Sequence, residues 1–171
     1  MFYNTYNGWH VLYVKSRHEK KVHHLLLKAS VESFLPLVKI KRQWSDRKKN
    51  ILKPLFPSYV FVNVHSSMDF YKALEVNGVC TFLRFGQEYA KVPGKEVDKI
   101  KILLGLKDVT SIQASVRVPK VGDIKKVTYG SLSGLECEVL RIDHNNKVMV
   151  RIGIDALQQN ITAFVPAYYL S

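Results

Sequence analysis

Hydrophobic and polar positions change their period about two thirds of the way along the chain. Up to about residue 107, strand-like alternation and helix-like spacing follow one another, and from there on every segment is strand-like. This change predicts an α+β architecture, in which a sheet flanked by helices precedes a small all-β barrel. We expect a first domain over residues 1–107, a linker over 108–119 and a second domain over 120–171.

The first domain opens with an aromatic and β-branched strand at residues 9–15, and the spacing then predicts a helix over 17–30. One face of that helix is apolar and a different face is basic. The apolar stripe consists of Val22, Leu25, Leu26 and Ala29.

The strongest strand signal is residues 55–64, LFPSYVFVNV. Pro57 can stand only at the start or on an edge of this strand, because proline has no amide hydrogen to donate to the ladder. The other segments of this domain are an alternating segment at 34–41, a loop or hairpin tip at 42–53, a weak helix at 66–76, a strand at 79–85 and a helix at 94–104 after Pro93.

The second domain contains four short strand-like runs with turn residues between them. We expect these strands at residues 123–129, 135–143, 147–154 and 159–165. Short strands at this spacing are typical of a small barrel.

The chain has a formal net charge of +12, with 47% hydrophobic and 23% charged residues, as folded soluble proteins have. Residues 1–107 hold 19 Lys/Arg against 8 Asp/Glu, a net of +11, whereas residues 108–171 hold 7 against 6, a net of +1. A basic excess favours nucleic acid or an anionic membrane surface as partner, and the alternative is charge that serves solubility alone. The apolar runs are shorter than ten residues and the start resembles no signal peptide, so we expect a cytoplasmic protein without a membrane partner.

Residues 15–53 concentrate the charge, with 12 Lys/Arg against 3 Asp/Glu. Cations that contact phosphates, together with an aromatic ring on which a base can stack, hold single strands without a rigid groove. The alternative is a solvated basic loop whose tryptophan folds back onto the sheet. The candidate nucleic-acid-binding residues are Lys15, Arg17, Lys21, His24 and Lys28 on the helix side, and Arg42, Trp44, Arg47 and Lys48 in the loop.

Catalytic and metal-binding patterns are lacking in the sequence. His18, His23 and His24 cluster, but neighbouring histidines on a helix point in different directions and no thiol or carboxylate completes a ligand set. Cys80 and Cys137 each lie in an apolar stretch, and we expect both to be small core residues. The chain is therefore expected to be no enzyme and to need no cofactor or metal.

The run Leu55–Val62 resembles the FPGYVFV signature of the NusG family of transcription elongation factors. Further motifs match in order: WHVL at 9–12, GV at 78–79 before FLRFG at 82–86, and VP at 92–93. In the second domain, VGD at 121–123 followed by GSLSG at 130–134 resembles the KOW motif. The resemblance covers nearly the whole chain and implies an NGN-like first domain and a KOW barrel as the second.

Within the family, LYVK at 12–15 and the residues at 54–62 and 82–86 resemble the specialised paralogues RfaH and UpxY. This resemblance implies a monomeric antiterminator that is recruited to particular long operons, where it suppresses pausing and termination. Two alternatives stay open: a general NusG-type factor that couples transcription to Rho or the ribosome, and a KOW-containing protein that binds RNA or the ribosome.

The resemblance also implies partners. NusG-like first domains bind the clamp helices of the largest RNA polymerase subunit through an apolar concavity, and the matching residues are Phe56, Tyr59, Phe61, Phe82 and Val92. Alternation along the strand places Tyr59 and Phe61 opposite Val60 and Val62, so one set can fill the core while the other meets the partner. The alternative is that Tyr59 and Phe61 are simply core.

In RfaH-like proteins the basic helix face reads the non-template DNA strand. This sequence departs from RfaH at Asn77, at Leu25 and at Asp69-Phe70-Tyr71, where RfaH has residues that contact DNA or the polymerase gate loop. The same DNA element and the gate-loop contact are therefore not implied here. A small-subunit ribosomal protein or Rho is the implied partner of the barrel, which we expect to be β-structured rather than refolded as the helical hairpin of RfaH.

Overall fold

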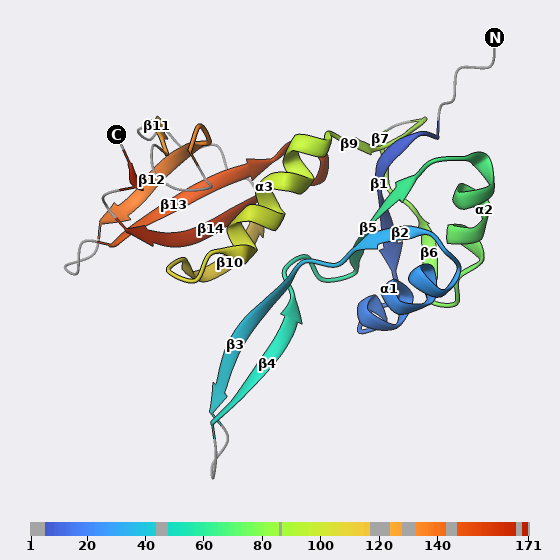
Figure 1. Ribbon diagram of the computed structural model, residues 1–171, viewed down its shortest axis with the longest axis horizontal. Coiled ribbons are helices and arrows are strands. Elements are labelled where there is room, and N and C mark those ends of the chain that lie inside the picture. The colour runs from blue at the N-terminus through green and yellow to red at the C-terminus, as the bar shows by residue number, and fades with distance from the viewer. Residues whose placement is uncertain are drawn as a thin grey trace. The chain divides into compact units, whose positions relative to one another are not determined.

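The computed structural model of the chain describes residues 6–43, 48–85, 87–116, 124–127, 133–142, 147–166 and 169–170. The chain forms two compact units, Met1–Gly94 and Lys95–Ser171, and each contains a five-stranded antiparallel sheet (Figure 1). With three α-helices among the described residues, the fold is mixed and rich in sheet, as the sequence pattern predicts.

The sheet of the first unit is built around β1 (Gly8–Val14). On one side β1 pairs with β5 (Tyr59–Val64), and β2 (Glu32–Phe34) lies beyond β5. Along its other edge β1 pairs with β6 (Val79–Phe82) and with β9 (Lys91–Val92). As expected, Pro57 precedes β5 and removes no ladder hydrogen bond.

Two helices, α1 (Glu19–Lys28) and α2 (Ser67–Glu75), contribute to the core on one face of this sheet. Both are amphipathic, and each fully buried aliphatic or aromatic side chain contributes roughly 1.5–3 kcal/mol relative to an exposed one. The core of this face, which we call the helix-covered face, contains Leu12, Val14, Val22, Leu26, Val60, Val62, Val64, Phe70, Ala73 and Phe82.

The turn at Asn77-Gly78 holds the start of β6 against α1. Gly78 has a φ of +104°, and a Cβ atom there would lie 3.0 Å from Cγ2 of Val22 and 3.3 Å from His18. The carbonyl of Gly78 accepts a hydrogen bond from the amide of Lys15 at 2.8 Å. Only glycine combines this backbone conformation with such a close approach.

A separate two-stranded hairpin projects from the sheet of the first unit (Figure 1). It consists of β3 (Leu37–Gln43) and β4 (Lys48–Pro54), and at its base the Leu55 amide donates to the Pro36 carbonyl at 2.8 Å. Residues 42–53, expected to be a loop or hairpin tip, are thus largely strand, because cross-strand pairing extends from Leu37/Pro54 to Gln43/Lys48. Trp44 and Arg47 lie outside the described residues. A small hairpin of β7 (Arg84–Phe85) and β8 (Glu88–Tyr89) follows β6.

In the second unit the sheet has the order β10-β14-β13-β12-β11. The strands are β10 (Thr110–Val116), β11 (Ile124–Lys126), β12 (Glu136–Ile142), β13 (Lys147–Ile154) and β14 (Gln159–Pro166). The four strands expected from the sequence are present, although β11 is described only over three residues. The stretch 108–119, expected to be a linker, instead contributes β10, whose residues 113–116 pair with β14.

The second unit is β-structured where RfaH-like refolding would have made it helical. Every second residue of β13 is buried, from Val148 to Ile154, and Ile161, Ala163 and Val165 alternate in the same way on β14. Between these strands lies one turn of 3-10 helix, η2 (Asp155–Leu157). The described part of residues 135–165 is otherwise strand or turn, so the β prediction is confirmed, whereas closure into a KOW barrel stays a prediction.

Helix α3 (Gly94–Gly105) is connected to this turn by a buried carboxylate. Glu96 is 6% exposed, and its carboxylate accepts hydrogen bonds from the amides of Asp155 at 3.1 Å and Ala156 at 3.4 Å. These two amides open η2 and have no partner within it, so the carboxylate satisfies donors that would otherwise be costly to bury. All but the first residue of α3 belongs to the second unit.

The two cysteines differ in environment. Cys137 is buried on β12, and burial raises the pKa of its thiol to about 11, so the side chain stays an uncharged core group as expected. Cys80 is exposed on β6, so the prediction of a core residue was wrong for this position, although Val79 and Phe82 of the same strand are apolar. None of the described helices has the length and apolarity needed to cross a bilayer.

Candidate functional site

Aromatic side chains gather on the face of the first sheet opposite α1 and α2. Cross-strand partners point to the same face, and β1, β2 and β5 pair Tyr13 with Tyr59 and Phe34 with Phe61. Ring centroids are 5.9 Å apart for Tyr13–Tyr59, 6.0 Å for Phe34–Phe61 and 5.9 Å for Phe56–Phe61. We call Tyr13, Phe34, Phe56, Tyr59 and Phe61 the aromatic face.

The residues of the aromatic face differ in exposure, and Tyr13 is the most exposed of them. Phe61 is 0% exposed and Phe56 is 1% exposed, whereas Tyr59 is partly exposed and Tyr13 is 45% exposed. An aromatic ring with an accessible surface and a hydroxyl at its tip is the kind of group that anchors protein interfaces. The accessible end of this face is therefore the Tyr13–Tyr59 pair, and Tyr13 was missed by the sequence analysis.

Two other residues expected at the polymerase-binding surface are not part of the accessible aromatic group. Phe82 pairs with Leu12 and stacks on Phe70 at a centroid distance of 4.2 Å, so it belongs to the helix-covered face. The expectation that Phe82 lies beside Tyr59 and Phe61 is corrected by this register, since residues opposite Leu12 point toward the helices. Val92 pairs with Trp9 and has the register of the aromatic face, but it is 4% exposed.

The turn before β5 fixes the position of Tyr59. Ser58 has a φ of +67°, a conformation that glycine adopts more easily and that the family signature provides with a glycine. The Ser58 amide donates to a carboxylate oxygen of Glu19 at 2.8 Å, and the Ser58 carbonyl accepts from the Val14 amide at 2.9 Å. Glu19 is buried at the start of α1 and thereby connects the helix to the aromatic end of the sheet.

The basic face of α1 is exposed as predicted. Lys21, His24 and Lys28 are all exposed, whereas Val22 and Leu26 are buried. The sequence analysis missed Lys20, whose ammonium group donates to the Leu52 carbonyl of β4 at 2.7 Å. This bond connects α1 to the hairpin, so the two basic elements are neighbours.

His23 adds no charge to this basic face at neutral pH. Burial, with a smaller contribution from neighbouring His24, lowers the pKa of His23 below its ordinary value of 6.5. Its Nδ1 atom lies 2.8 Å from the hydroxyl oxygen of Ser33. His23 therefore belongs to the packing between α1 and β2.

The turn between β1 and α1 brings cations close to the exposed tyrosines. Lys15 and Arg17 are exposed, and Arg17 has a φ of +65° that sharpens the turn. Lys15 is two residues from Tyr13, which pairs with Tyr59. One end of the sheet thus carries an aromatic pair beside two cations.

The hypothesis of nucleic-acid binding requires the basic residues of the hairpin to be exposed. Arg42 and Lys48 are both exposed near the end of the described strands. The predicted roles of Trp44 and Arg47 concern residues outside the described part and stay predictions.

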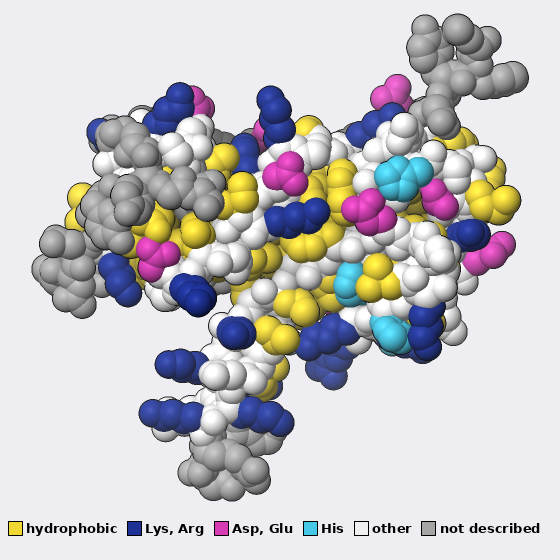
Figure 2. Space-filling model, viewed as in Figure 1, with side chains coloured by type: hydrophobic (Ala, Val, Ile, Leu, Met, Phe, Trp, Pro, Cys, Tyr) yellow, Lys and Arg dark blue, Asp and Glu magenta, His cyan; other side chains and the backbone are white. Residues whose placement is uncertain are grey.

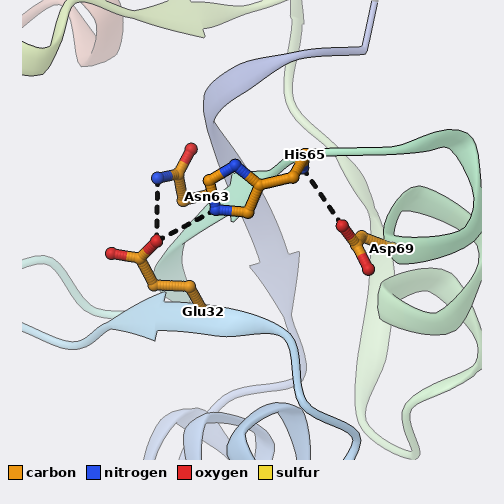
Figure 3. A network of polar contacts seen from close by, with 4 residues as sticks. All are labelled: Glu32, Asn63, His65 and Asp69. Carbon is orange, nitrogen blue, oxygen red and sulfur yellow. Dashed lines mark hydrogen bonds and ion pairs between the residues drawn. The ribbon is translucent and has the colours of Figure 1, made fainter.

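The polar network at the opposite end of β5 is structural in character (Figure 3). Glu32 accepts from Asn63 at 2.9 Å and lies 3.2 Å from His65 Nε2, while the His65 amide donates to Asp69 at 3.1 Å. The Ser66 hydroxyl, at the N-cap of α2, accepts from the Asp69 amide at 3.2 Å and so satisfies one amide of the first turn. Across the described residues, no three His, Cys, Asp or Glu side chains are grouped as metal ligands would be.

A family model described as "Transcription termination factor nusG" matches residues 7–101, which is more than half of the chain. The chain belongs to the NusG family. The matched segment contains the aromatic face, the basic face of α1 and the hairpin, so every described candidate residue of this NusG-family chain lies within it.

Among solved structures, this NusG-family chain is similar to the chain in the structure described as "Domain interaction in Thermotoga maritima NusG". The TM-score is 0.60, and the sequences are 22% identical over 96% of each chain. That likeness shows the fold. A chain of the "MjSpt4:Spt5 complex conformation B" aligns over 95% of each chain with 15% identity. Its TM-score of 0.33 is too low for a conclusion about the fold.

Proposed function

We propose that this chain is a specialised elongation factor that binds RNA polymerase and the non-template DNA strand and suppresses pausing and termination in particular long operons. The clamp helices of the largest polymerase subunit are the protein partner, and the Tyr13–Tyr59 end of the aromatic face is the contact. The specialised role is supported by the RfaH- and UpxY-like motifs at 12–15, 54–62 and 82–86.

One observation carries the proposal: an accessible aromatic pair lies beside exposed cations at one end of a sheet in a NusG-family chain. Tyr13 and Tyr59 are paired across β1 and β5, and Lys15 and Arg17 follow Tyr13 in the next turn. An apolar anchor with a cationic rim suits a partner in which protein and nucleic acid lie side by side. A transcribing polymerase presents both.

The cationic part of the site extends along α1. Lys21, His24 and Lys28 are exposed at helical spacing, and exposed lysines neutralise phosphates without reading bases. Holding the non-template strand in this way makes no bond and breaks none. The factor therefore acts by shifting the polymerase between conformations, in proportion to its differential affinity for them.

A transcription assay with purified RNA polymerase tests the function. On a template with a pause site and a terminator, we expect the chain to shorten the pause and raise read-through. The double variant Tyr13→Ala/Tyr59→Ala should abolish the effect, and Lys21→Gln/Lys28→Gln should weaken it. Ile142→Ala, at an exposed apolar position of the second unit that is 71% accessible, is the control and should behave like the unsubstituted chain.

A general NusG role is the second candidate, and the similarity to Thermotoga NusG and the matching family description favour it. Such a factor would recruit Rho or a small-subunit ribosomal protein through its second unit. Capture of purified Rho by the full chain, together with increased termination in the assay above, would support this role and contradict the antiterminator. Free-standing RNA binding by the second unit is disfavoured by its net charge of +1 over residues 108–171.

A further inference from the structure

The turn between β1 and α1, residues 15–18, presents cations on a well-bonded backbone. The His18 amide donates to the Lys15 carbonyl across the turn at 3.0 Å, and the Lys15 amide donates to the Gly78 carbonyl at 2.8 Å. Lys15 and Arg17 are both exposed, and Figure 2 shows basic side chains, in dark blue and cyan, on the surface over α1. This segment, which we call the cationic turn, therefore offers phosphates a preformed contact next to the helix.

A second turn, residues 56–59, places Tyr59 at the start of β5. The Tyr59 amide donates to the Phe56 carbonyl at 3.2 Å, and Ser58, the third residue of this turn, follows Pro57 and has a φ of +67°. Proline followed by a residue with positive φ is the pattern of a type II turn. That turn uses the amide of its last residue and the carbonyl of its first, so the amide and the carbonyl of Ser58 are left for partners outside it.

Both of these Ser58 groups bond to residues that flank the cationic turn. The Ser58 carbonyl accepts from the amide of Val14, which precedes residues 15–18, at 2.9 Å. The Ser58 amide donates to the carboxylate of Glu19, which follows them, at 2.8 Å. Of these two bonds only the second involves a side chain, so a substitution of Glu19 can loosen the connection while the backbone bond is kept.

Glu19 holds α1 against the turn that carries Tyr59. It is 6% exposed and lies in the first turn of α1, where the helix dipole favours a negative charge. A buried carboxylate is costly unless a donor satisfies it, and the Ser58 amide is such a donor. Movement of α1 away from this turn would break the bond, and the arrangement of the two surfaces is therefore held in place.

We infer that Glu19 is a positioning residue whose bond to Ser58 fixes the tyrosine pair relative to the cations of α1, so that polymerase and the non-template strand are bound together. This inference rests on the proposed function and concerns how its two contacts cooperate. When one molecule binds two sites of the same complex, the gain from the second contact depends on how well the two surfaces match the spacing of the sites. A loosened connection lowers this gain while each separate contact stays intact.

The alternative is that Glu19 only stabilises the first unit. Loss of its bond would then lower the folded fraction, and the affinities for the polymerase and for the single strand would fall by the same factor. A positioning residue changes neither separate affinity and lowers only the gain obtained when both partners are in one complex. Separate and joint binding therefore distinguish the two interpretations.

Fluorescence anisotropy of the labelled full chain with purified RNA polymerase on two DNA scaffolds tests the inference. One scaffold has a complete non-template strand in its open bubble, and the other lacks this strand in the bubble. The ratio of the two affinities is the gain due to the strand. Binding of a labelled single-stranded oligonucleotide by the unlabelled chain measures the strand contact alone.

Two variants of Glu19 separate the reach of the side chain from its charge. Glu19→Asp keeps the charge but is one methylene group shorter, whereas Glu19→Gln loses the charge but can still accept from the Ser58 amide. Glu96→Asp is the matched control, because Glu96 is also 6% exposed and its carboxylate accepts from two backbone amides within the second unit. All are measured at a temperature at which thermal unfolding shows each variant to be folded.

We expect the strand to raise the affinity of the unsubstituted chain for polymerase at least about tenfold, and that of Glu19→Asp no more than about twofold. Glu19→Gln and Glu96→Asp should keep most of the gain, and the separate affinities should change little in all three. A Glu19→Asp variant that keeps the gain, or that loses both separate affinities by the same factor, would overturn the inference. A gain that Glu19→Gln loses and Glu19→Asp keeps would also overturn it, because the charge and not the reach would then matter.

The same measurements separate this inference from the proposed function. If the unsubstituted chain gains nothing from the strand, or if Tyr13→Ala/Tyr59→Ala binds the polymerase without the strand at full affinity, the proposed function fails and the inference fails with it. If the gain is present and the tyrosine variant loses affinity, but Glu19→Asp keeps the gain, the proposed function stands and the positioning role of Glu19 fails.

Discussion

The two faces of the first sheet use the same strands for different purposes. On the helix-covered face, Val60, Val62 and Val64 of β5 are all buried under α1 and α2. On the aromatic face, burial is complete at Phe61 but falls toward Tyr59 and Tyr13. Alternation thus separates the core from the candidate interface, and exposure on the second face is greatest at Tyr13. Stability and binding should accordingly respond to different substitutions.

The largest expected effect is on stability, at the two buried aromatic positions, one on each face. Phe61→Ala and Phe82→Ala should each lower the free energy of unfolding of the first unit by about 3–5 kcal/mol, because each leaves a cavity among packed rings. Urea unfolding followed by circular dichroism measures the loss. A loss at Phe61 of less than about 1 kcal/mol would mean that the aromatic face is not packed there.

The next largest effect is also on stability and concerns the Gly78 turn, which packs against α1 on the helix-covered face. Gly78→Ala should destabilise the chain by about 2 kcal/mol, since the added Cβ meets Val22 at 3.0 Å in a backbone conformation with positive φ. Gly105→Ala, where a Cβ meets nothing within 4 Å and φ is not positive, is the matched control and should have little effect. Equal melting temperatures for the two variants would contradict this account of the turn.

At the aromatic end of the sheet, a substitution in the strained turn at Ser58 should increase the stability of the chain. Ser58→Gly should stabilise the chain by up to about 1 kcal/mol, because glycine adopts the positive φ of this position without steric strain and the amide bond to Glu19 is kept. Its greater freedom in the unfolded chain offsets part of the gain. Thermal unfolding measures the shift, and a clear loss of stability would show that the Ser58 side chain itself contributes.

The smallest effect is the dependence of stability on pH. Burial lowers the pKa of His10, outweighing its contacts at 3.0–3.1 Å with the Tyr6 and Ala90 carbonyls, and burial likewise lowers the pKa of His23. Near pH 6.5, the ordinary pKa of histidine, the unfolded state therefore binds more protons than the folded state. The stability that results from the lowered pKa values is present above that pH and is lost as the pH falls below it.

Melting temperatures between pH 7.5 and pH 5.5 test this direction. The melting temperature should fall on acidification, and the fall should be smaller in His23→Gln, which lacks the titrating ring while its side-chain amide can still bond to Ser33. Stability that rises toward pH 5.5 would contradict a lowered pKa at both histidines.

Much of the fold could be predicted from periodicity and turn residues. The alternation of β13 and β14, the helical spacing of α1 and the Asn77-Gly78 turn all have local signals that the structure bears out. The burial of Glu19 and Glu96 has no such signal. The cap that Glu96 provides to η2 and the pairing of β10 with β14 depend on contacts far along the chain, so a polar stretch after α3 was expected to be a linker.

Only part of the candidate site could be predicted, because the rest depends on contacts between residues far apart in the chain. Period-two alternation correctly separated Tyr59 from Val60, but the face of Phe82 depends on its register with Leu12. Tyr13 was missed because its exposure is set by strand pairing, and Lys20 because its contact with Leu52 crosses 32 residues. The exposed basic residues were predictable, since charge on a helix face opposite an apolar stripe is a local pattern.

The central claim is that the Tyr13–Tyr59 end of the aromatic face binds RNA polymerase, and the affinity of purified polymerase for the labelled full chain tests it most directly. We expect Tyr13→Ala/Tyr59→Ala to weaken binding by at least about tenfold, while circular dichroism shows that the chain stays folded. The reason is that aromatic anchor residues at protein interfaces contribute about 2 kcal/mol or more to binding. Ile142→Ala should bind like the unsubstituted chain. A folded double tyrosine variant that binds polymerase with unchanged affinity would contradict the account.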